Sequence, residues 1–128
     1  DVLIGNDLNI YPSYYEPWGY TPLESAAFHI PTITTNLAGF GLWVNSELKR
    51  NGLLSDGVEV VERNDSNYFE TADVITKIIC TFAKISEKEV AEYRSKAVKL
   101  ADKALWKHFI KNYLRAYDFA LRAAESRK

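Results

Sequence analysis

Between residues 8 and 82, short strand-like runs alternate with helical patterns. The first strand is expected within residues 8–13, where Pro12 terminates it. Residues 32–35, which are rich in β-branched side chains, and residues 58–62 have the patterns of a second and a third strand. Parallel strands need helical crossovers, so this alternation favours an open, Rossmann-like α/β sheet of three parallel strands with helices on both faces. Because such sheets usually have about four to six strands, we expect the C-terminal portion of a larger domain.

The first two helices are expected after the first and second strands. One is predicted over 23–29, with Thr21 as its N-cap and Pro22 in its first turn. The segment 36–41 is predicted as a loop in which two glycines can adopt positive φ. The next helix is predicted over 42–51, ended by the glycine that follows.

A third helix of about 18 residues is expected after the polar segment 64–67. One apolar face of this helix is predicted to contain Phe69, Ala72, Ile75, Ile79 and Phe82. Cys80 lies in the same stretch, and we interpret it as a small buried residue. As the only cysteine, it excludes an intrachain disulfide and a cysteine-cluster metal site.

Residues 86–128 are predicted to form a helical extension that packs on the α/β part. Ser86 and Glu89 have the spacing of a capping box, and a bend is expected near Leu105. The apolar face of the first helix is predicted to contain Val90, Tyr93, Ala97, Leu100 and Ala104. A last helix carries side chains whose spacing is more typical of packing than of cofactor binding: Trp106, Ile110, Tyr113, Tyr117, Ala120 and Ala124.

Length and charge limit the class of protein. A chain of 128 residues that is 47% hydrophobic suits one globular domain over 1–128 and excludes a disordered chain. With 16 basic and 17 acidic residues, no overall cationic field favours a nucleic acid or a membrane as partner. Residues 1–85 have 5 basic and 11 acidic side chains, whereas 86–128 have 11 and 6. This split either steers an anion or a partner or, as we prefer, marks a solvated basic helix face.

The sequence also indicates where the protein is located and whether the chain is complete. No apolar run approaches the roughly 18 to 20 residues that cross a bilayer, and no signal peptide opens the chain, so we expect a cytoplasmic protein. The sequence contains no methionine, even at position 1. We therefore expect a fragment or a processed product that holds only part of an active site.

The segment between the first strand and the first helix lies where open α/β sheets bind ligands, beyond the carboxyl ends of the strands. A helix that begins at Thr21 or Pro22 points unpaired amides and its positive dipole end into this crevice. Gly19 leaves room for a close backbone approach, and the amides of Tyr20 and Thr21 are expected to donate hydrogen bonds. A diphosphate suits such a site.

Two carboxylates flank this anion site, Glu16 and Glu24, with seven residues between them. A carboxylate accepts paired hydrogen bonds from vicinal hydroxyls, so Glu24 is a candidate to bind a ribose and Glu16 to face a sugar. Alternatively, Glu24 only complements the helix dipole as an acidic residue of the first turn. The spacing of two glutamates is by itself a weak signal.

The complete sequence around the two glutamates is a more specific signal than their spacing. Residues 11–24 read Tyr-Pro-Ser-Tyr-Tyr-Glu-Pro-Trp-Gly-Tyr-Thr-Pro-Leu-Glu, and residues 30–41 read Ile-Pro-Thr-Ile-Thr-Thr-Asn-Leu-Ala-Gly-Phe-Gly. This text resembles the signature of the eukaryotic-type glycogen synthases, which are retaining glucosyltransferases of the GT-B fold. The match is looser over 106–121. The resemblance implies that the chain is the C-terminal part of the donor-binding Rossmann domain.

The resemblance also implies roles for single residues. Glu16 would lie near the donor glucose and the reacting centre, Trp18 and Gly19 would line the glucose pocket, Tyr20 and Thr21 would bind the diphosphate, and Glu24 would bind the ribose. The implied reaction transfers glucose from UDP-glucose to the 4-hydroxyl of an α-1,4-glucan with retained configuration. The implied site needs no metal or other cofactor, because a helix dipole and basic residues neutralise the diphosphate.

Some features depart from the family pattern or lie outside the chain. His29 stands where the family usually has glycine, and the basic residues near the chain's end are not obvious equivalents of the family's regulatory arginine cluster. The Arg and Lys that bind the diphosphate, and the N-terminal acceptor domain, are expected upstream of Asp1. We therefore expect the isolated chain to be inactive, and an oligomer is compatible with the sequence. Two alternatives stay open: a retaining GT-B transferase with another nucleotide-sugar or acceptor, and a noncatalytic nucleotide-sugar-binding or assembly module.

Overall fold

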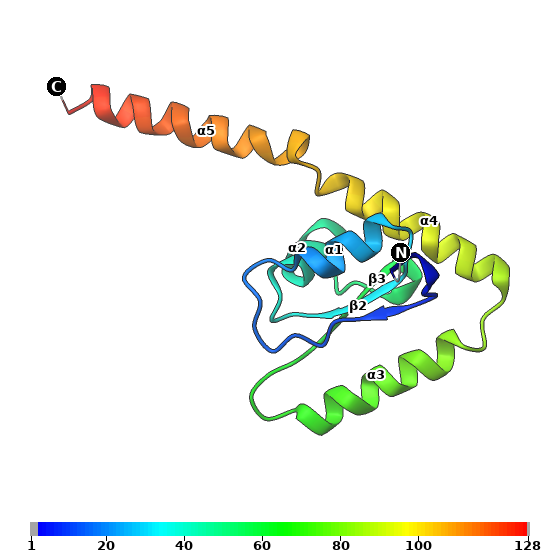
Figure 1. Ribbon diagram of the computed structural model, residues 1–128. Helices are drawn as coiled ribbons and strands as arrows, with labels where there is room; N and C mark the ends of the chain where they lie inside the picture. Colours follow the sequence, from blue (N-terminus) through cyan, green and yellow to red (C-terminus); the bar gives the residue numbers. More distant parts are fainter. Residues whose placement is uncertain (1–2, 128) are drawn as a thin grey trace.

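The computed structural model describes residues 3–127 and contains a three-stranded parallel sheet (Figure 1). The strands β1 (Asn9–Ile10), β2 (Thr32–Thr35) and β3 (Val58–Val61) lie in the order β1-β2-β3. Ile33 of the central strand pairs with Ile10 on one side and Glu59 on the other. The prediction of an α/β fold with three parallel strands is confirmed. All four residues of β2 are buried, as expected for a central strand that is covered on both faces.

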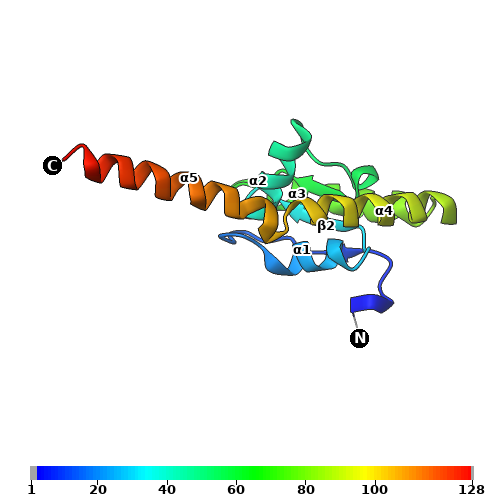
Figure 2. The same ribbon diagram turned by 90° about the horizontal axis from the view of Figure 1, so that it is seen from above.

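Helices cover both faces of this sheet (Figures 1 and 2). On one face lie α1 (Tyr20–Ala27), α2 (Gly39–Leu48) and α4 (Glu87–Lys103), and α3 (Tyr68–Phe82) covers the other. Short 3₁₀ turns at Leu3–Gly5 and Leu54–Asp56 precede β1 and β3. The prediction of helices on both faces is therefore confirmed.

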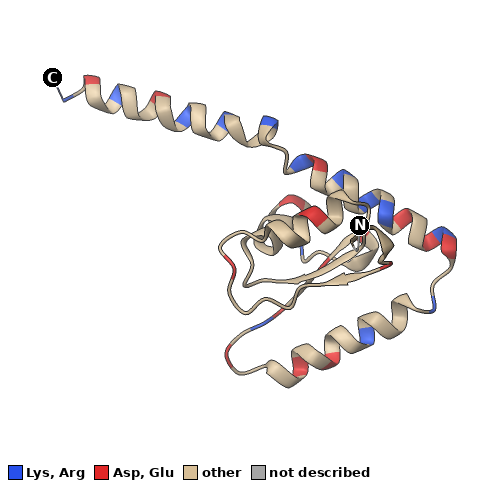
Figure 3. Cartoon of the chain, viewed as in Figure 1, with Lys and Arg blue, Asp and Glu red and all other residues tan. Residues whose placement is uncertain are grey.

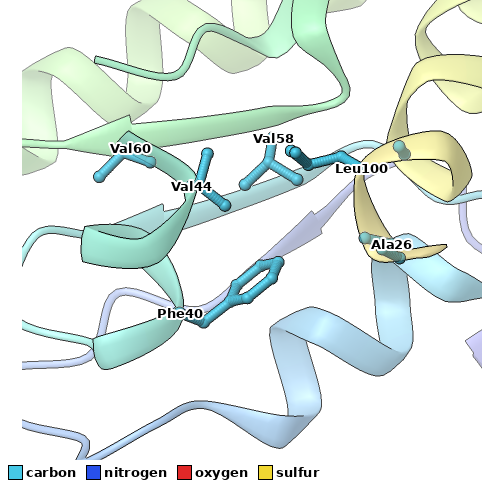
Figure 4. Close-up of a cluster of buried hydrophobic side chains, with 8 residues drawn as sticks. Ala26, Phe40, Val44, Val58, Val60 and Leu100 are labelled. Carbon is cyan, nitrogen blue, oxygen red and sulfur yellow. The ribbon is translucent and has the colours of Figure 1, made fainter. Parts of the chain in front are cut away.

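The main hydrophobic cluster joins the first of these helical layers to β3 (Figure 4). Its buried members are Ala26, Phe40, Val44, Val58, Val60, Ala97, Leu100 and Ala101. Phe40 is the largest fully buried side chain of the described residues, and burying a side chain of this size contributes about 1.5–3 kcal/mol. A smaller cluster on the opposite face consists of Ile33, Leu54 and Val61, with Ile75, Ile78 and Phe82 of α3 packed against it.

The boundaries of α1 and α2 differ from the predicted ones. The N-cap of α1 is Gly19, with φ 107°, so this helix begins before Thr21. Pro22 is the third helical residue, where the missing N–H costs no hydrogen bond because the first turn has none to make. The helix α2 starts at Gly39 and ends at Leu48, followed by the C-cap Lys49, which adopts φ 55°. The expectation that the glycines of 36–41 form a loop with positive φ is wrong.

The prediction for the face of α3 is only partly right. Ile75 and Phe82 pack against the smaller cluster, but Phe69 is 78% exposed and Ile79 is also exposed. Cys80 is exposed too, so its interpretation as a buried residue is wrong. The period of three to four residues locates a helix face, but not how far the sheet beneath it extends.

The C-terminal extension consists of α4 and α5 (Trp106–Glu125). The capping box of Ser86 and Glu89 is confirmed, and Ala97, Leu100 and Ala104 are buried as predicted. The helix α5 follows a bend and extends away from the sheet, with no buried residue (Figure 2). Lys and Arg residues recur along both helices (Figure 3).

The aromatic face of α5 is largely exposed in the described part of the chain. Trp106 is 58% exposed and Tyr117 59%, while Phe109 packs edge-on against Trp18 and Trp43. Contact with the α/β part is therefore concentrated near the start of α5. Within 3–127, no helix is long and apolar enough to span a membrane.

Two glutamates are predicted to change stability with pH in opposite directions. Burial raises the pKa of Glu59, although the hydrogen bond from the Leu54 amide partly opposes this effect. The hydrogen bonds from the Ser86 backbone and hydroxyl lower the pKa of Glu89. A raised folded-state pKa means that stability is lost as pH rises, and a lowered one that stability is lost as pH falls. We expect Glu59→Gln to raise the melting temperature at pH 7 by a few degrees and to lose this advantage below about pH 4.

The comparison is thermal unfolding of the chain between pH 4 and 8. Glu89→Gln is the control of opposite sign, because it should lower the melting temperature at pH 7 and have less effect at pH 4. If both variants shifted the melting temperature equally at every pH, the opposite directions assigned to the two pKa values would be contradicted.

Candidate functional site

The segment after β1 runs beside the segment after β2, beyond the carboxyl ends of the strands. The amide of Glu16 donates to the Leu37 carbonyl over 3.2 Å, and the amide of Gly39 donates to the Glu16 carbonyl over 3.1 Å. Glu16 and Ala38 thus form an isolated parallel bridge. One step further, the Phe40 amide donates to the Trp18 carbonyl over 2.5 Å. These bonds extend the β1–β2 pairing into the two loops and fix where Glu16 lies.

Gly39 permits this close approach. A Cβ at position 39 would overlap the carbonyl oxygen of Pro17 and would lie 3.1 Å from the Trp18 Cα. Because the obstacle is backbone, it cannot turn aside as a flexible side chain can. Gly39 is therefore needed because a side chain would not fit. This requirement explains the glycine, which does not adopt the positive φ expected from the sequence.

The Glu16 side chain faces the start of α1. Its Oε2 accepts a hydrogen bond from the Ser13 hydroxyl at 3.1 Å, and the side chain is half-buried. A Cβ at Gly19 would lie 3.5 Å from the same Oε2. The carboxylate is therefore adjacent to the residue that caps α1.

The amino end of α1 offers free donors at this point. Gly19 is the N-cap and provides no side-chain cap, and its carbonyl accepts from Leu23. Tyr20 and Thr21 are exposed, and their amides have no acceptor within residues 3–127. The two amides and the positive end of the helix dipole suit an anionic group, and the Glu16 carboxylate faces the glycine that precedes them.

The other two predicted site residues have different surroundings. Glu24 is exposed on α1, one turn after the free amides. The Trp18 ring packs against Phe40 and Phe109, with centroid distances of 6.2 and 5.8 Å. Trp18 also borders a hollow of about 490 Å³ between α1 and α5. The structure therefore brings Glu16, Gly19 and the two amides together, keeps Glu24 nearby on the same helix, and packs the Trp18 ring mainly into an aromatic cluster.

His29 adopts φ 62°, in the left-handed region that favours glycine. It follows the C-cap of α1, so it lies at the opposite end of this helix from the free amides. The backbone at this position explains why glycine suits it. Nothing places the imidazole near the candidate site.

Sequence reasoning missed Arg63. This residue follows β3, and its guanidinium donates to the Pro12 carbonyl and faces the Tyr14 ring. The only signal in the sequence is a basic side chain directly after a strand at the carboxyl edge of the sheet. Because Pro12 and Arg63 are 51 residues apart, local patterns do not reveal their contact.

Comparison with known proteins gives consistent matches over the whole chain. The family model described as Glycogen synthase matches residues 1–128. The glycogen [starch] synthase of Neurospora crassa is 36% identical over 125 residues, which cover 97% of this chain and 17% of that protein. Isoform 2 from Saccharomyces cerevisiae is 33% identical over 118 residues, covering 92% and 17%, and the human liver protein is 32% identical over 120 residues, covering 94% and 17%. The chain thus spans about 17% of the length of these curated relatives.

Replacing Gly39 by alanine is predicted to separate the two loops. Because the added methyl group overlaps backbone, we expect Gly39→Ala to lower the free energy of unfolding by about 1–3 kcal/mol or more. Chemical denaturation of the chain measures this loss. Gly5→Ala is the matched control, since a Cβ there meets nothing within 4 Å. Equal stability of the two variants would contradict the proposed role of Gly39.

Proposed function

The chain belongs to the glycogen synthase family, a family of glycosyltransferases, and from this premise we propose that it forms the nucleotide-sugar-binding part of a longer retaining glucosyltransferase. The proposed reaction transfers glucose from UDP-glucose to the 4-hydroxyl of an α-1,4-glucan. The bond between the glucose C1 and the diphosphate oxygen breaks, and its electron pair leaves with UDP. The acceptor hydroxyl bonds to C1 on the face from which UDP leaves, and its proton passes to the departing diphosphate.

The observation that carries this proposal is the pair of free amides beside a carboxylate. The amides of Tyr20 and Thr21 have no acceptor within 3–127, and they follow Gly19, where a Cβ would lie 3.5 Å from the Glu16 Oε2. Charge develops on the leaving diphosphate as the bond to glucose breaks. Fixed donors at a helix N-terminus stabilise that charge without having to reorganise.

Glu16 is proposed to act on the sugar. Its amide and its carbonyl are both hydrogen-bonded to the segment after β2, and its carboxylate accepts a hydrogen bond from Ser13. A fixed carboxylate accepts hydrogen bonds from two neighbouring glucose hydroxyls and orients C1 toward the acceptor. Trp18 and Gly19 are proposed to limit the space around the sugar.

Glu24 is proposed to bind the ribose of the nucleotide. Its exposed position on α1, past the amides, is compatible with a ligand whose phosphates lie at the helix start and whose ribose lies farther along. We propose further that the α-glucan binds against parts of the enzyme outside this chain. No metal is proposed, because the helix dipole and basic groups of the complete enzyme would neutralise the diphosphate.

Substitution of the two glutamates is predicted to have different kinetic effects in the complete enzyme. Glu16→Ala should lower kcat far more than it weakens donor binding, because its contacts matter most at the reacting sugar. Glu24→Ala should mainly weaken UDP binding, by about 1–3 kcal/mol for a lost hydrogen bond to a charged group. Steady-state kinetics with UDP-glucose and glycogen, together with calorimetric titration by UDP, measure both effects.

Glu47→Ala is a suitable control, since this glutamate lies near the carboxyl end of α2 and pairs with Lys103. Small and equal effects of Glu16→Ala and Glu24→Ala would refute the assignment. Running the same assay with ADP-glucose tests the donor, because transfer from that sugar alone would favour a different retaining transferase.

A further inference from the structure

Arg63 contacts the loops that follow all three strands. Its own position is two residues after β3, and its backbone amide donates to the Asn36 Oδ1, after β2, over 2.7 Å. Its Nη1 donates to the carbonyl of Pro12, after β1. The sheet order β1-β2-β3 means that Arg63 spans the full width of the described sheet at its carboxyl edge.

The guanidinium also faces two aromatic rings. Its Cζ lies 5.2 Å from the centroid of the Tyr14 ring and 5.9 Å from that of Tyr68, both within the range of cation–π attraction. The Tyr14 hydroxyl donates to Asp65, and this hydrogen bond raises the pKa of Tyr14. The segments 12–14 and 63–65 are thus joined by two hydrogen bonds, from Arg63 to Pro12 and from Tyr14 to Asp65, and by the cation–π contact of Arg63 with the Tyr14 ring.

The attached segment leads directly to Glu16. Ser13 lies between Pro12 and Tyr14, its hydroxyl donates to the Glu16 carboxylate at 3.1 Å, and its carbonyl accepts from Thr35 Oγ1 at 2.7 Å. On the other side, Glu16 is paired with Leu37 and Gly39. Glu16 therefore has two supports, and Arg63 contributes to the one on its N-terminal side.

The start of α1 has a support of its own. The Phe40 amide binds the Trp18 carbonyl, and the Phe40 side chain is fully buried in the main cluster. None of the Arg63 contacts reaches Gly19, Tyr20 or Thr21. Loosening of 12–14 should therefore disturb the Glu16 carboxylate more than the helix amides.

We propose that Arg63 is a positioning residue, which fixes the segment 12–14 so that Ser13 holds the Glu16 carboxylate in the orientation needed for glucose transfer. This role rests on the proposed function of Glu16. Arg63 itself does not touch the donor, since its guanidinium is turned to Pro12 and the two tyrosine rings.

The test uses the complete enzyme with Arg63→Met, which keeps a long side chain and loses the charge and the donors. We expect kcat for glucose transfer to fall by about tenfold to 100-fold, as for other small displacements of a reacting group, while the Kd for UDP stays within about twofold. Arg63→Lys keeps a cation that faces the rings and can donate to Pro12, so it should recover part of the lost kcat. Arg50→Met is the matched control, because it removes an exposed arginine that pairs with Asp56 at 2.8 Å, near the opposite end of α2 from Gly39.

Three results would overturn the proposal: an unchanged kcat in Arg63→Met, a parallel loss of kcat and UDP affinity, or no recovery in Arg63→Lys. If Arg63→Met does not fold, Arg63→Gln decides, since it keeps a polar side chain but loses the guanidinium that donates to Pro12 and faces the two rings. A fall in kcat at constant UDP affinity then supports the proposal, and an unchanged kcat contradicts it. An unsubstituted enzyme that transfers no glucose would instead refute the proposed function itself, and the role of Arg63 with it.

Discussion

The close contact between the backbones at Pro17 and Gly39 organises the rest of the site. It allows Glu16 to donate to Leu37 and to accept from Gly39, and Phe40 to donate to Trp18, where the regular sheet has already ended. These bonds set the direction in which the chain enters α1 and leave its first amides free. A side chain at position 39 would force the two loops apart, because the space is filled by backbone.

Phe40 connects this contact to the hydrophobic core. Its amide binds the loop before α1, and its ring is fully buried with residues of α1, α2, α4 and β3 (Figure 4). The energy of core packing therefore stabilises the geometry of the loops as well as the layers of the fold. A site that depends on a few loop hydrogen bonds gains rigidity in this way, since the core is the least mobile part of a domain.

Sequence patterns predicted the three strands and singled out the two glutamates, but they did not reveal the structural roles of several other residues. The β-branched run at 32–35 predicts a buried strand because burial and side-chain shape act locally. Gly39 was expected to serve a turn, since a sequence does not distinguish a glycine needed for φ from one needed for space. Cys80 was expected to be buried because it lies in an apolar helical stretch, but it is exposed, since the helical period does not reveal how far the neighbouring sheet extends. Arg63 was missed because its partners are distant along the chain.

We propose above all that the free amides of Tyr20 and Thr21, which follow the glycine next to Glu16, bind the diphosphate of the donor. A structure of the complete enzyme with UDP tests it most directly. We predict phosphate oxygens within hydrogen-bonding distance, about 3 Å, of both amides, with Glu24 at the ribose hydroxyls. Phosphates bound only by groups outside this chain, with both amides facing solvent, would contradict it.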